Sequence, residues 1–145
     1  MSGGQGMNER RDFLKASAAL AAGMAVSGAS RAIAGSGTYP ANIIYTAENP
    51  GQWAKKAGIH APVVTKDGFK ITITTNHSMS EIHYIVRHTL VAEDGTVIGA
   101  QAFSPDDEKP VSTYDLYDFS GDVGTKVYAT SFCNLHDFWL TEFKL

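Results

Sequence analysis

Short runs of alternating apolar and polar residues are the strongest constraint on the fold of this chain. Residues 69–74 read FKITIT, and their β-branched side chains recur with the two-residue period of a half-buried strand. The segments expected to form further strands are 42–46, 83–91, 97–103, 112–119, 126–132 and 138–144. Asp94-Gly95 predicts a hairpin turn between two of them. No long amphipathic helix is predicted after residue 34, so the sequence favours an all-β fold.

The number and spacing of these strands indicate the architecture. About six to eight short strands in about 110 residues are typical of an antiparallel β-sandwich or a small barrel. The full chain has 145 residues, of which 43% are hydrophobic, and this is enough for one packed core. We therefore expect a single folded domain.

The N-terminal region resembles a twin-arginine (Tat) export signal. Arg10 and Arg11 are followed by Asp-Phe-Leu-Lys and then by an alanine-rich, weakly apolar run over residues 16–30. Residues 32–34 read Ala-Ile-Ala, the small-x-small pattern of a cleavage site. A membrane anchor is the alternative, but glycine and serine interrupt this short run. We expect a signal peptide at 1–34, a mature domain at 35–145, export to the periplasm and no membrane anchor in the mature form.

The charge of the expected mature domain excludes two classes of partner. Removing residues 1–34 reduces the 12 basic and 15 acidic residues of the chain to 8 and 13, which gives a net charge of −5. Such an acidic domain is a poor match for nucleic acid or for an anionic membrane surface.

The stretch 132–139, FCNLHDFW, combines a thiol, an imidazole and large aromatic side chains. Cys133 is the only cysteine of the chain, so it is a free thiol, an intermolecular bridge or a metal ligand. His136 follows three residues later, and both side chains can reach one metal ion from a tight loop. The Tat pathway exports folded proteins, often with their cofactors loaded, and this favours a ligand.

Four of the five histidines are expected in loops or at strand ends. His60 precedes a strand, whereas His77 and His83 lie on either side of a short connection and can therefore converge. His136 comes from the Cys133 loop. His88 lies within a predicted strand and has no companion, so we interpret it as a surface residue or a satisfied core group. Imidazole and thiolate ligands suit iron, copper or zinc.

Three ordered motifs resemble the iron-centre domain of superoxide reductases, the neelaredoxin and desulfoferrodoxin family. The resemblance covers about residues 53–145, and it rests on His60-x-Pro62-Val63-Val64, His77-x5-His83-Tyr84-Ile85 and Cys133-Asn134-x-His136-x-x-Trp139. It implies an immunoglobulin-like β-sandwich of about seven to eight strands. The chain has no additional four-cysteine module, so the resemblance is to the one-iron neelaredoxin type.

The resemblance also implies a site and a reaction. Mononuclear iron would be bound by four histidines and an axial thiolate, and the residues at these positions are His60, His77, His83, His136 and Cys133. The ferrous iron would reduce superoxide to hydrogen peroxide by one electron, with backbone amides near Asn134 and Leu135 hydrogen-bonded to the sulfur. An electron donor protein of unidentified type would return the iron to its ferrous state. A homo-oligomer is also possible.

The chain departs from the family pattern just before the first histidine. The family usually has Glu-Lys there, whereas this chain has Gly58 and Ile59. Lys55 or Lys56, from a loop about two residues longer, is then the candidate to attract superoxide, and the alternative is that both lysines are simply solvated. Two further hypotheses are a non-catalytic exported iron-binding or electron-transfer protein and a blue-copper carrier. The copper hypothesis lacks a methionine after the last histidine and leaves two histidines without a role.

Overall fold

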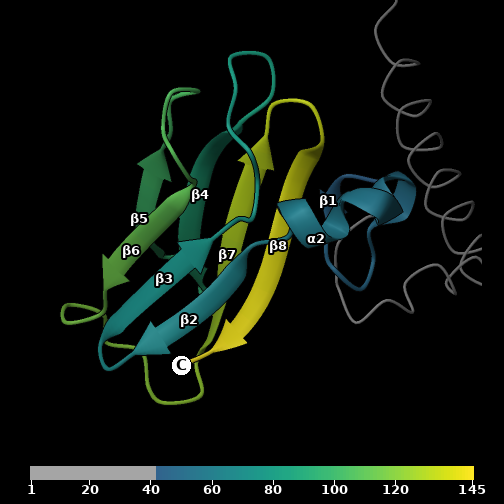
Figure 1. Ribbon diagram of the computed structural model, residues 1–145. Helices are drawn as coiled ribbons and strands as arrows, with labels where there is room; N and C mark the ends of the chain where they lie inside the picture. The colour runs from purple at the N-terminus through teal and green to yellow at the C-terminus, as the bar shows by residue number, and fades with distance from the viewer. Residues whose placement is uncertain (1–41) are drawn as a thin grey trace, which may run out of the picture. The chain divides into compact units, whose positions relative to one another are not determined.

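Two β-sheets pack face to face in the folded domain (Figure 1). The computed structural model describes residues 42–145, and these residues contain eight strands and two short helical segments. The strands are β1 (Ile44–Tyr45), β2 (Val63–Asp67), β3 (Lys70–Thr74), β4 (Ile85–Ala92), β5 (Val97–Ala102), β6 (Val111–Asp115), β7 (Lys126–Cys133) and β8 (Asp137–Lys144). The predicted all-β sandwich of about seven to eight strands is therefore confirmed.

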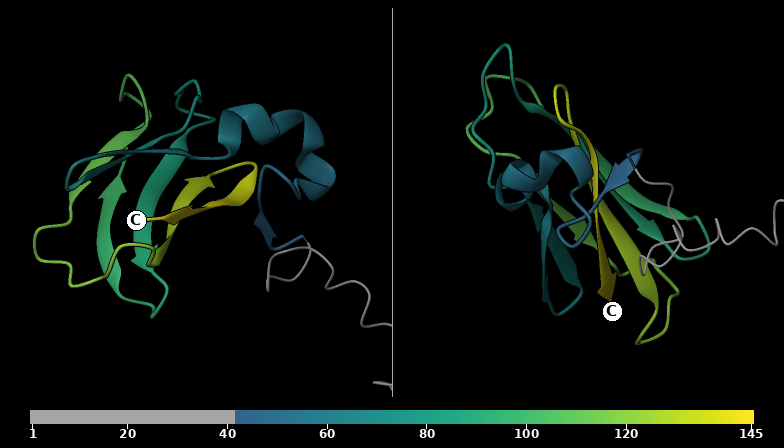
Figure 2. Two further views of the ribbon diagram at one scale, coloured as in Figure 1. Left: turned by 90° about the horizontal axis from the view of Figure 1, so that it is seen from below. Right: turned by 90° about the vertical axis from the view of Figure 1, so that its right-hand side faces the viewer.

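The two sheets differ in size and in the direction of their strands. Among the described residues, one sheet has the order β1-β8-β7-β4-β5 and the other has the order β2-β3-β6. Neighbouring strands are antiparallel with one exception, because β1 runs parallel to β8 and pairs Ile44 with Phe138 and Tyr45 with Trp139. The antiparallel prediction thus fails at this two-residue edge strand. Figure 2 shows the two sheets from below and from the side.

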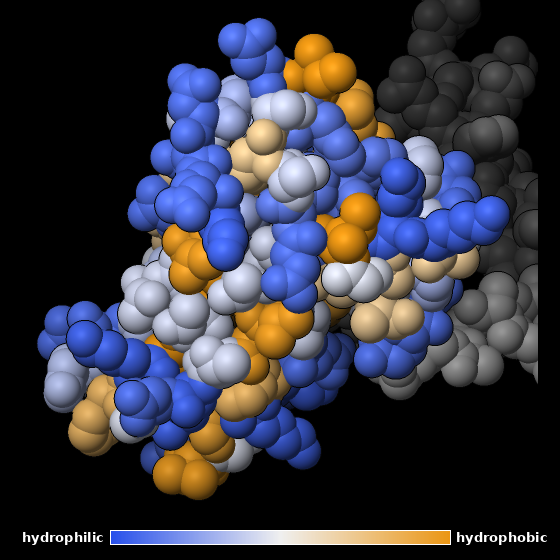
Figure 3. Space-filling view, viewed as in Figure 1, coloured by the Kyte–Doolittle hydropathy of each residue, from blue (hydrophilic) through white to orange (hydrophobic). Residues whose placement is uncertain are grey.

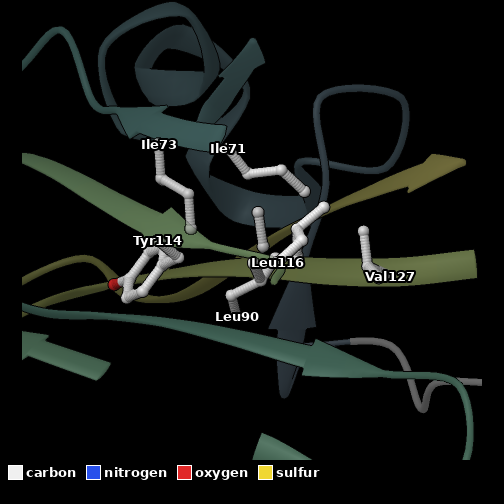
Figure 4. Packing of buried hydrophobic residues seen from close by; sticks show 7 residues of the cluster. Ile71, Ile73, Leu90, Tyr114, Leu116 and Val127 are labelled. Atoms are coloured by element: carbon white, nitrogen blue, oxygen red, sulfur yellow. The ribbon is translucent and has the colours of Figure 1, made fainter. Parts of the chain in front are cut away.

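The hydrophobic core lies between the sheets, as the alternation in the sequence predicts. Ile71 and Ile73 on β3 are fully buried, whereas Thr72 between them pairs on the outer face with Thr113 through a 3.1 Å hydroxyl contact. Leu90 and Val127 meet the two isoleucines from the larger sheet (Figure 4). The outer face of the sheet formed by β2, β3 and β6 is mostly hydrophilic, with small separate apolar patches (Figure 3).

Several predicted element bounds are wrong. The segment that carries Lys55 and Lys56, expected to be a loop, is helical, with a 3-10 helix η2 (Gly51–Lys56) followed by one turn of α-helix, α2 (Ala57–His60). At ten residues together they are too short to produce a helical hydrophobic period. The strand expected over 112–119 ends as β6 at Asp115, and β3 ends three residues before His77. Among the described residues, no helix is long and apolar enough to cross a membrane.

A bulge in β4 changes which of its side chains face the core. The pairing of β4 with β7 shifts between Ile85 and Arg87, so that Ile85 and His88 are both buried although they are three residues apart. The alternation of buried and exposed residues along this strand is therefore interrupted just before His88. Figure 1 shows the β3–β4 connection and the β7–β8 loop at the same end of the sandwich, with α2 beside β8.

Candidate metal centre

The helical segment η2–α2 presents His60 at the last position of α2. Its imidazole is fully buried, and its Nδ1 lies 3.0 Å from the carbonyl oxygen of Lys56, one turn earlier. A carbonyl can only accept, so Nδ1 carries the proton and Nε2 presents a lone pair. Nε2 is buried and has no hydrogen-bond partner among residues 42–145.

The connection between β3 and β4 brings His77 and His83 together. Ser80 and His83 form an isolated bridge with reciprocal backbone hydrogen bonds of 3.0 and 3.1 Å, which folds the connection back on itself. The Nε2 atoms of His77 and His83 lie 2.9 Å apart. The predicted convergence of these two imidazoles is present in the structure.

Cys133 is the last residue of β7, and His136 lies in the β7–β8 loop that follows it. Asn134 fixes this loop to the β3–β4 connection, because its side chain accepts a hydrogen bond from Tyr84 N (3.0 Å) and donates one to Ile82 O (3.0 Å). Trp139 donates from Nε1 to the carbonyl oxygen of His136 at 2.8 Å. These bonds attach the loop to the β3–β4 connection and to Trp139, next to the other histidines.

Five candidate ligands from three separate segments converge at this end of the sandwich. The nearest ligand atoms of His60, His77, His83 and Cys133 all lie within 4.8 Å of one another. His136 joins them, with Nδ1 at 2.9 Å from His83 Nε2 and 3.7 Å from Cys133 Sγ. The ring of His60 also lies against those of His77 and His136, with centroid distances of 4.6 and 4.7 Å.

The sulfur of Cys133 is enclosed by backbone donors. The thiol is 1% exposed, and burial raises its pKa, whereas hydrogen bonds from the backbone amides of Leu135 and His136 lower it. Leu135 is one of the residues whose amides the sequence predicts beside the sulfur. The amide of Asn134 instead donates to Tyr84 O at 3.2 Å.

The histidines of the cluster are neutral at physiological pH. Burial lowers the pKa of His60 to about 4, and the nearby imidazoles lower it further. Burial followed by repulsion from His83 lowers the pKa of His77 to about 4. The pKa values of His83 and His136 are also lowered, mainly by burial. Neutral imidazoles are the form that binds metal ions.

Of the two candidate lysines, Lys56 is the one that interacts with the clustered histidines. Its carbonyl orients His60, and its ammonium lowers the pKa of His77, His83 and His136. The same charge lowers the pKa of the Cys133 thiol. Lys55 on the same short helix is exposed, whereas Lys56 is half-buried. Gly58 and Ile59 stand between Lys56 and His60, and Ile59 is 43% exposed.

The residues present fit a transition-metal ion. Imidazole nitrogen and thiolate sulfur together suit iron, copper or zinc rather than magnesium or calcium. A buried ring nitrogen without a partner costs about 1–3 kcal/mol, and a metal at His60 Nε2 would remove that cost. The Lys56 carbonyl that fixes the His60 tautomer has the orienting role seen around metal-bound histidines.

One contact beside the cluster is absent from the sequence-based predictions. Trp53 on η2 donates from Nε1 to Asp137 Oδ2 at 2.8 Å, and its ring meets His136 edge-on at a centroid distance of 4.7 Å. Asp137 has a φ of 66°, in the left-handed backbone region that residues other than glycine rarely adopt. Trp53 and Asp137 are 84 residues apart, so no local sequence signal could have paired them.

The fold and the cluster together define a β-sandwich with a candidate metal centre of histidine and cysteine side chains at one end. The desulfoferrodoxin family model matches residues 51–142, which include all five candidate ligands. The chain therefore belongs to the desulfoferrodoxin family. The model of the Tat pathway signal sequence matches residues 7–27, outside the described residues.

Solved structures of superoxide reductases share this fold. The enzyme from Nanoarchaeum equitans is 28% identical, with a TM-score of 0.54 over 71% of this chain and 100% of that one. The neelaredoxin of Ignicoccus hospitalis is 24% identical, with a TM-score of 0.58 over 70% of this chain and 93% of that one. The one-iron enzyme of Giardia intestinalis is also 24% identical, with a TM-score of 0.52 over 59% of this chain and 97% of that one. At 24% identity the likeness shows the fold alone. No curated protein sequence matches the chain.

Proposed function

We propose that the protein is a superoxide reductase that converts superoxide to hydrogen peroxide at a mononuclear iron. The observation that carries this proposal is the convergence of four neutral imidazoles and one enclosed thiol within a family whose solved relatives include superoxide reductases. His60, His77, His83, His136 and Cys133 would hold the iron. When bound, ferrous iron would supply one electron and an open coordination position for superoxide.

The chain's own residues would prepare this site in three ways. The amides of Leu135 and His136 would stabilise the thiolate form of Cys133. The Lys56 carbonyl would hold His60 in the tautomer that offers Nε2. The Lys56 ammonium would attract the superoxide anion and raise its local concentration. The net reaction consumes one superoxide, one electron and two protons for each hydrogen peroxide released.

The location and partners of the protein form part of the proposal. The Tat signal supports export, and we place the mature domain, residues 35–145, in the periplasm after removal of residues 1–34. Two arrangements are compatible with turnover, a monomer or a homo-oligomer, since all five candidate ligands come from one chain. An electron donor protein would return the iron to its ferrous state.

Pulse-generated superoxide mixed with the ferrous protein tests the proposed reaction. We expect one hydrogen peroxide for each superoxide consumed, one iron oxidised, and no dioxygen released. Metal analysis of the purified protein should find one iron per chain. Dioxygen formed in parallel with peroxide would indicate dismutation instead, and copper in place of iron would indicate an electron carrier.

A non-catalytic iron protein of the same fold is the second candidate. Gly58 and Ile59 replace the glutamate and lysine usual in the family, and this observation favours it. Ile59→Lys restores a cation at an exposed position. A variant that reacts with superoxide at least tenfold faster than the wild type would show that the natural site is poorly adapted to turnover. An unchanged rate would show that Ile59 does not limit the reaction.

A further inference from the structure

A chain of buried hydrogen bonds links residues of both sheets, and two of these residues are close in sequence to candidate ligands. His88 on β4 lies at its middle, with Nε2 at 2.9 Å from Thr75 Oγ1 and Nδ1 at 2.9 Å from Ser112 Oγ. Thr75 in turn donates to Ser131 Oγ at 2.9 Å. We call Ser112, His88, Thr75 and Ser131 the polar relay. None of the four is more than 5% exposed.

The geometry of the polar relay fixes the direction of each hydrogen bond. Since Thr75 donates its hydroxyl proton to Ser131, its oxygen accepts from His88 Nε2–H. His88 Nδ1 is then an acceptor, and the Ser112 hydroxyl donates to it. The imidazole is therefore neutral and held in one tautomer, which satisfies every ring nitrogen without a charge in the core.

The polar relay joins both sheets. His88 and Ser131 are cross-strand partners on β4 and β7 in the larger sheet. Ser112 lies on β6 of the smaller sheet, and Thr75 follows directly after β3. Hydrogen bonds that cross a sandwich fix the relative positions of its sheets more narrowly than apolar contacts, which have no preferred direction.

Two members of the polar relay lie two residues before candidate ligands. The Thr75 carbonyl accepts a hydrogen bond from His77 N at 2.8 Å, so a shift of Thr75 moves His77. Ser131 and Cys133 are alternate residues of β7, and both are buried on its inner face. The bond between Thr75 and Ser131 therefore couples the segments that carry His77 and Cys133.

We infer that the polar relay sets the position of His77 relative to Cys133 and so controls the affinity and geometry of the metal centre. Thr75 and Ser131 are positioning residues that contact no metal, and His88 supports them from the core. This inference rests on the proposed metal centre, but it does not depend on the reaction with superoxide.

Thr75→Val and Thr75→Ser form the central test. Valine keeps the volume of threonine but removes the hydroxyl, whereas serine keeps the hydroxyl. Fe²⁺ affinity and the thiolate-to-iron absorption band of the oxidised protein are measured for both. We expect Thr75→Val to weaken Fe²⁺ binding by about 10- to 100-fold and to shift the band. Thr75→Ser should resemble the wild type in both measurements.

Thr89→Val is the matched control. It makes the same chemical change on β4, at a buried hydroxyl that has no hydrogen-bond partner within residues 42–145. This variant should keep the wild-type affinity and absorption band. If Thr75→Val does not fold, Ser131→Ala tests the same bond from the other side.

The outcomes separate this inference from the proposed function. Wild-type affinity and an unshifted band in Thr75→Val or Ser131→Ala would overturn the role of the polar relay and leave the proposed reaction standing. A wild-type protein that binds iron but does not react with superoxide would overturn only the proposed function. A wild-type protein that binds no iron would overturn both.

Discussion

Lys56 is the residue through which this chain places a positive charge beside its candidate metal centre. The lysine usual in the family would lie next to the first histidine, whereas Lys56 lies one helical turn before His60. Its charge nevertheless acts on three histidines and on the thiol. Residues i and i+4 of a helix lie on one face, so Lys56 and His60 are on the same face of this helical turn.

Lys56→Ala should lower the rate of the superoxide reaction by roughly tenfold at low ionic strength, because it removes the cation that attracts the anion. The rate should also lose most of its dependence on salt concentration. Stopped-flow or pulse kinetics of the ferrous protein measure both effects. Lys55→Ala is the matched control and should change the rate little. Equal losses in the two variants would show that only the overall charge matters.

His88 should make the stability of the domain depend on pH. Burial lowers its pKa from 6.5 to about 4 in the folded state. The unfolded state therefore binds more protons between these values, and the stabilisation from neutral His88 is complete above pH 6.5 and is lost as the pH falls toward 4. The loss amounts to about 3 kcal/mol at most.

Urea unfolding of the metal-free protein at pH 7 and pH 5 measures this effect. His88→Leu should be less stable at pH 7, since it leaves Thr75 and Ser112 without their partner, but its stability should fall less between the two pH values. The contribution of the other buried histidines is common to both proteins. An identical decrease in the variant would exclude His88 as a source of the pH dependence.

At the scale of elements, the helical segment η2–α2 is attached to the β7–β8 loop by Trp53. The bond from Trp53 to Asp137 connects the segment that carries Lys56 and His60 to the β7–β8 hairpin that carries Cys133 and His136. Asp137 accepts this bond from a left-handed backbone conformation, which aspartate and asparagine tolerate better than most residues. The side chain at this position therefore serves both the turn and the attachment of the helix.

Asp137→Ala should reduce the free energy of unfolding by about 1–2 kcal/mol, because it loses the bond to Trp53 and keeps an unfavourable φ. Asp137→Asn should lose much less, since asparagine tolerates the conformation and its oxygen can accept the same bond. Asp137→Gly removes the strain without restoring the bond. Chemical denaturation of the three variants separates the two effects, and equal stabilities would contradict both.

Sequence periodicity predicts some elements of this fold well and others poorly. Residues 69–74 alternate cleanly because β3 has one face in the core, and the structure confirms that strand. The η2–α2 segment has no detectable period because each helix is so short. The parallel pairing of β1 with β8 depends on contacts between residues about 94 positions apart, which no local pattern encodes.

The candidate ligands could be predicted from the sequence more completely than the residues that position them. His60, His77, His83, Cys133 and His136 follow from three short motifs in a fixed order, and the structure places all five together. The bulge near Val86 and the hydroxyl partners of His88 could not be foreseen, because they depend on the register between strands. The candidate ligands can be predicted from sequence motifs, whereas the residues that orient them can be identified only from the packing of the strands.

At the scale of the whole molecule, a bound metal would connect segments that the hydrophobic core does not. The core lies between the sheets, around Ile71, Ile73 and Leu90. The cluster instead joins α2, the β3–β4 connection and the β7–β8 loop at one end of the sandwich. Metal binding and folding should therefore be thermodynamically coupled.

Fe²⁺ at about 1,000 times its dissociation constant should raise the free energy of unfolding by roughly 4 kcal/mol. Thermal unfolding under anaerobic conditions, with and without metal, measures the change. Removing the metal with a chelator should reverse it. Cys133→Ser should show a much smaller increase, and an equal increase would mean that the thiol takes no part in binding.

Export should require the twin arginines. Replacing Arg10 and Arg11 together by lysine should leave the precursor unprocessed inside the cell, because the Tat pathway reads that pair. Cell fractionation and immunoblotting measure the distribution of precursor and mature chain. Processing at the wild-type level would contradict export by this route.

The strand order also dictates when the domain can be completed during synthesis. β7 is the middle strand of the larger sheet, yet it follows β4, β5 and β6 along the chain. Until β7 and the following loop leave the ribosome, β4 lacks its main partner and His60, His77 and His83 lack Cys133 and His136. A nascent chain that stops before β8 therefore cannot form the complete ligand set, and the larger sheet can close only after β7 and β8 have been synthesised. The Tat pathway transports folded proteins, and this suits a domain whose strands pair in this order.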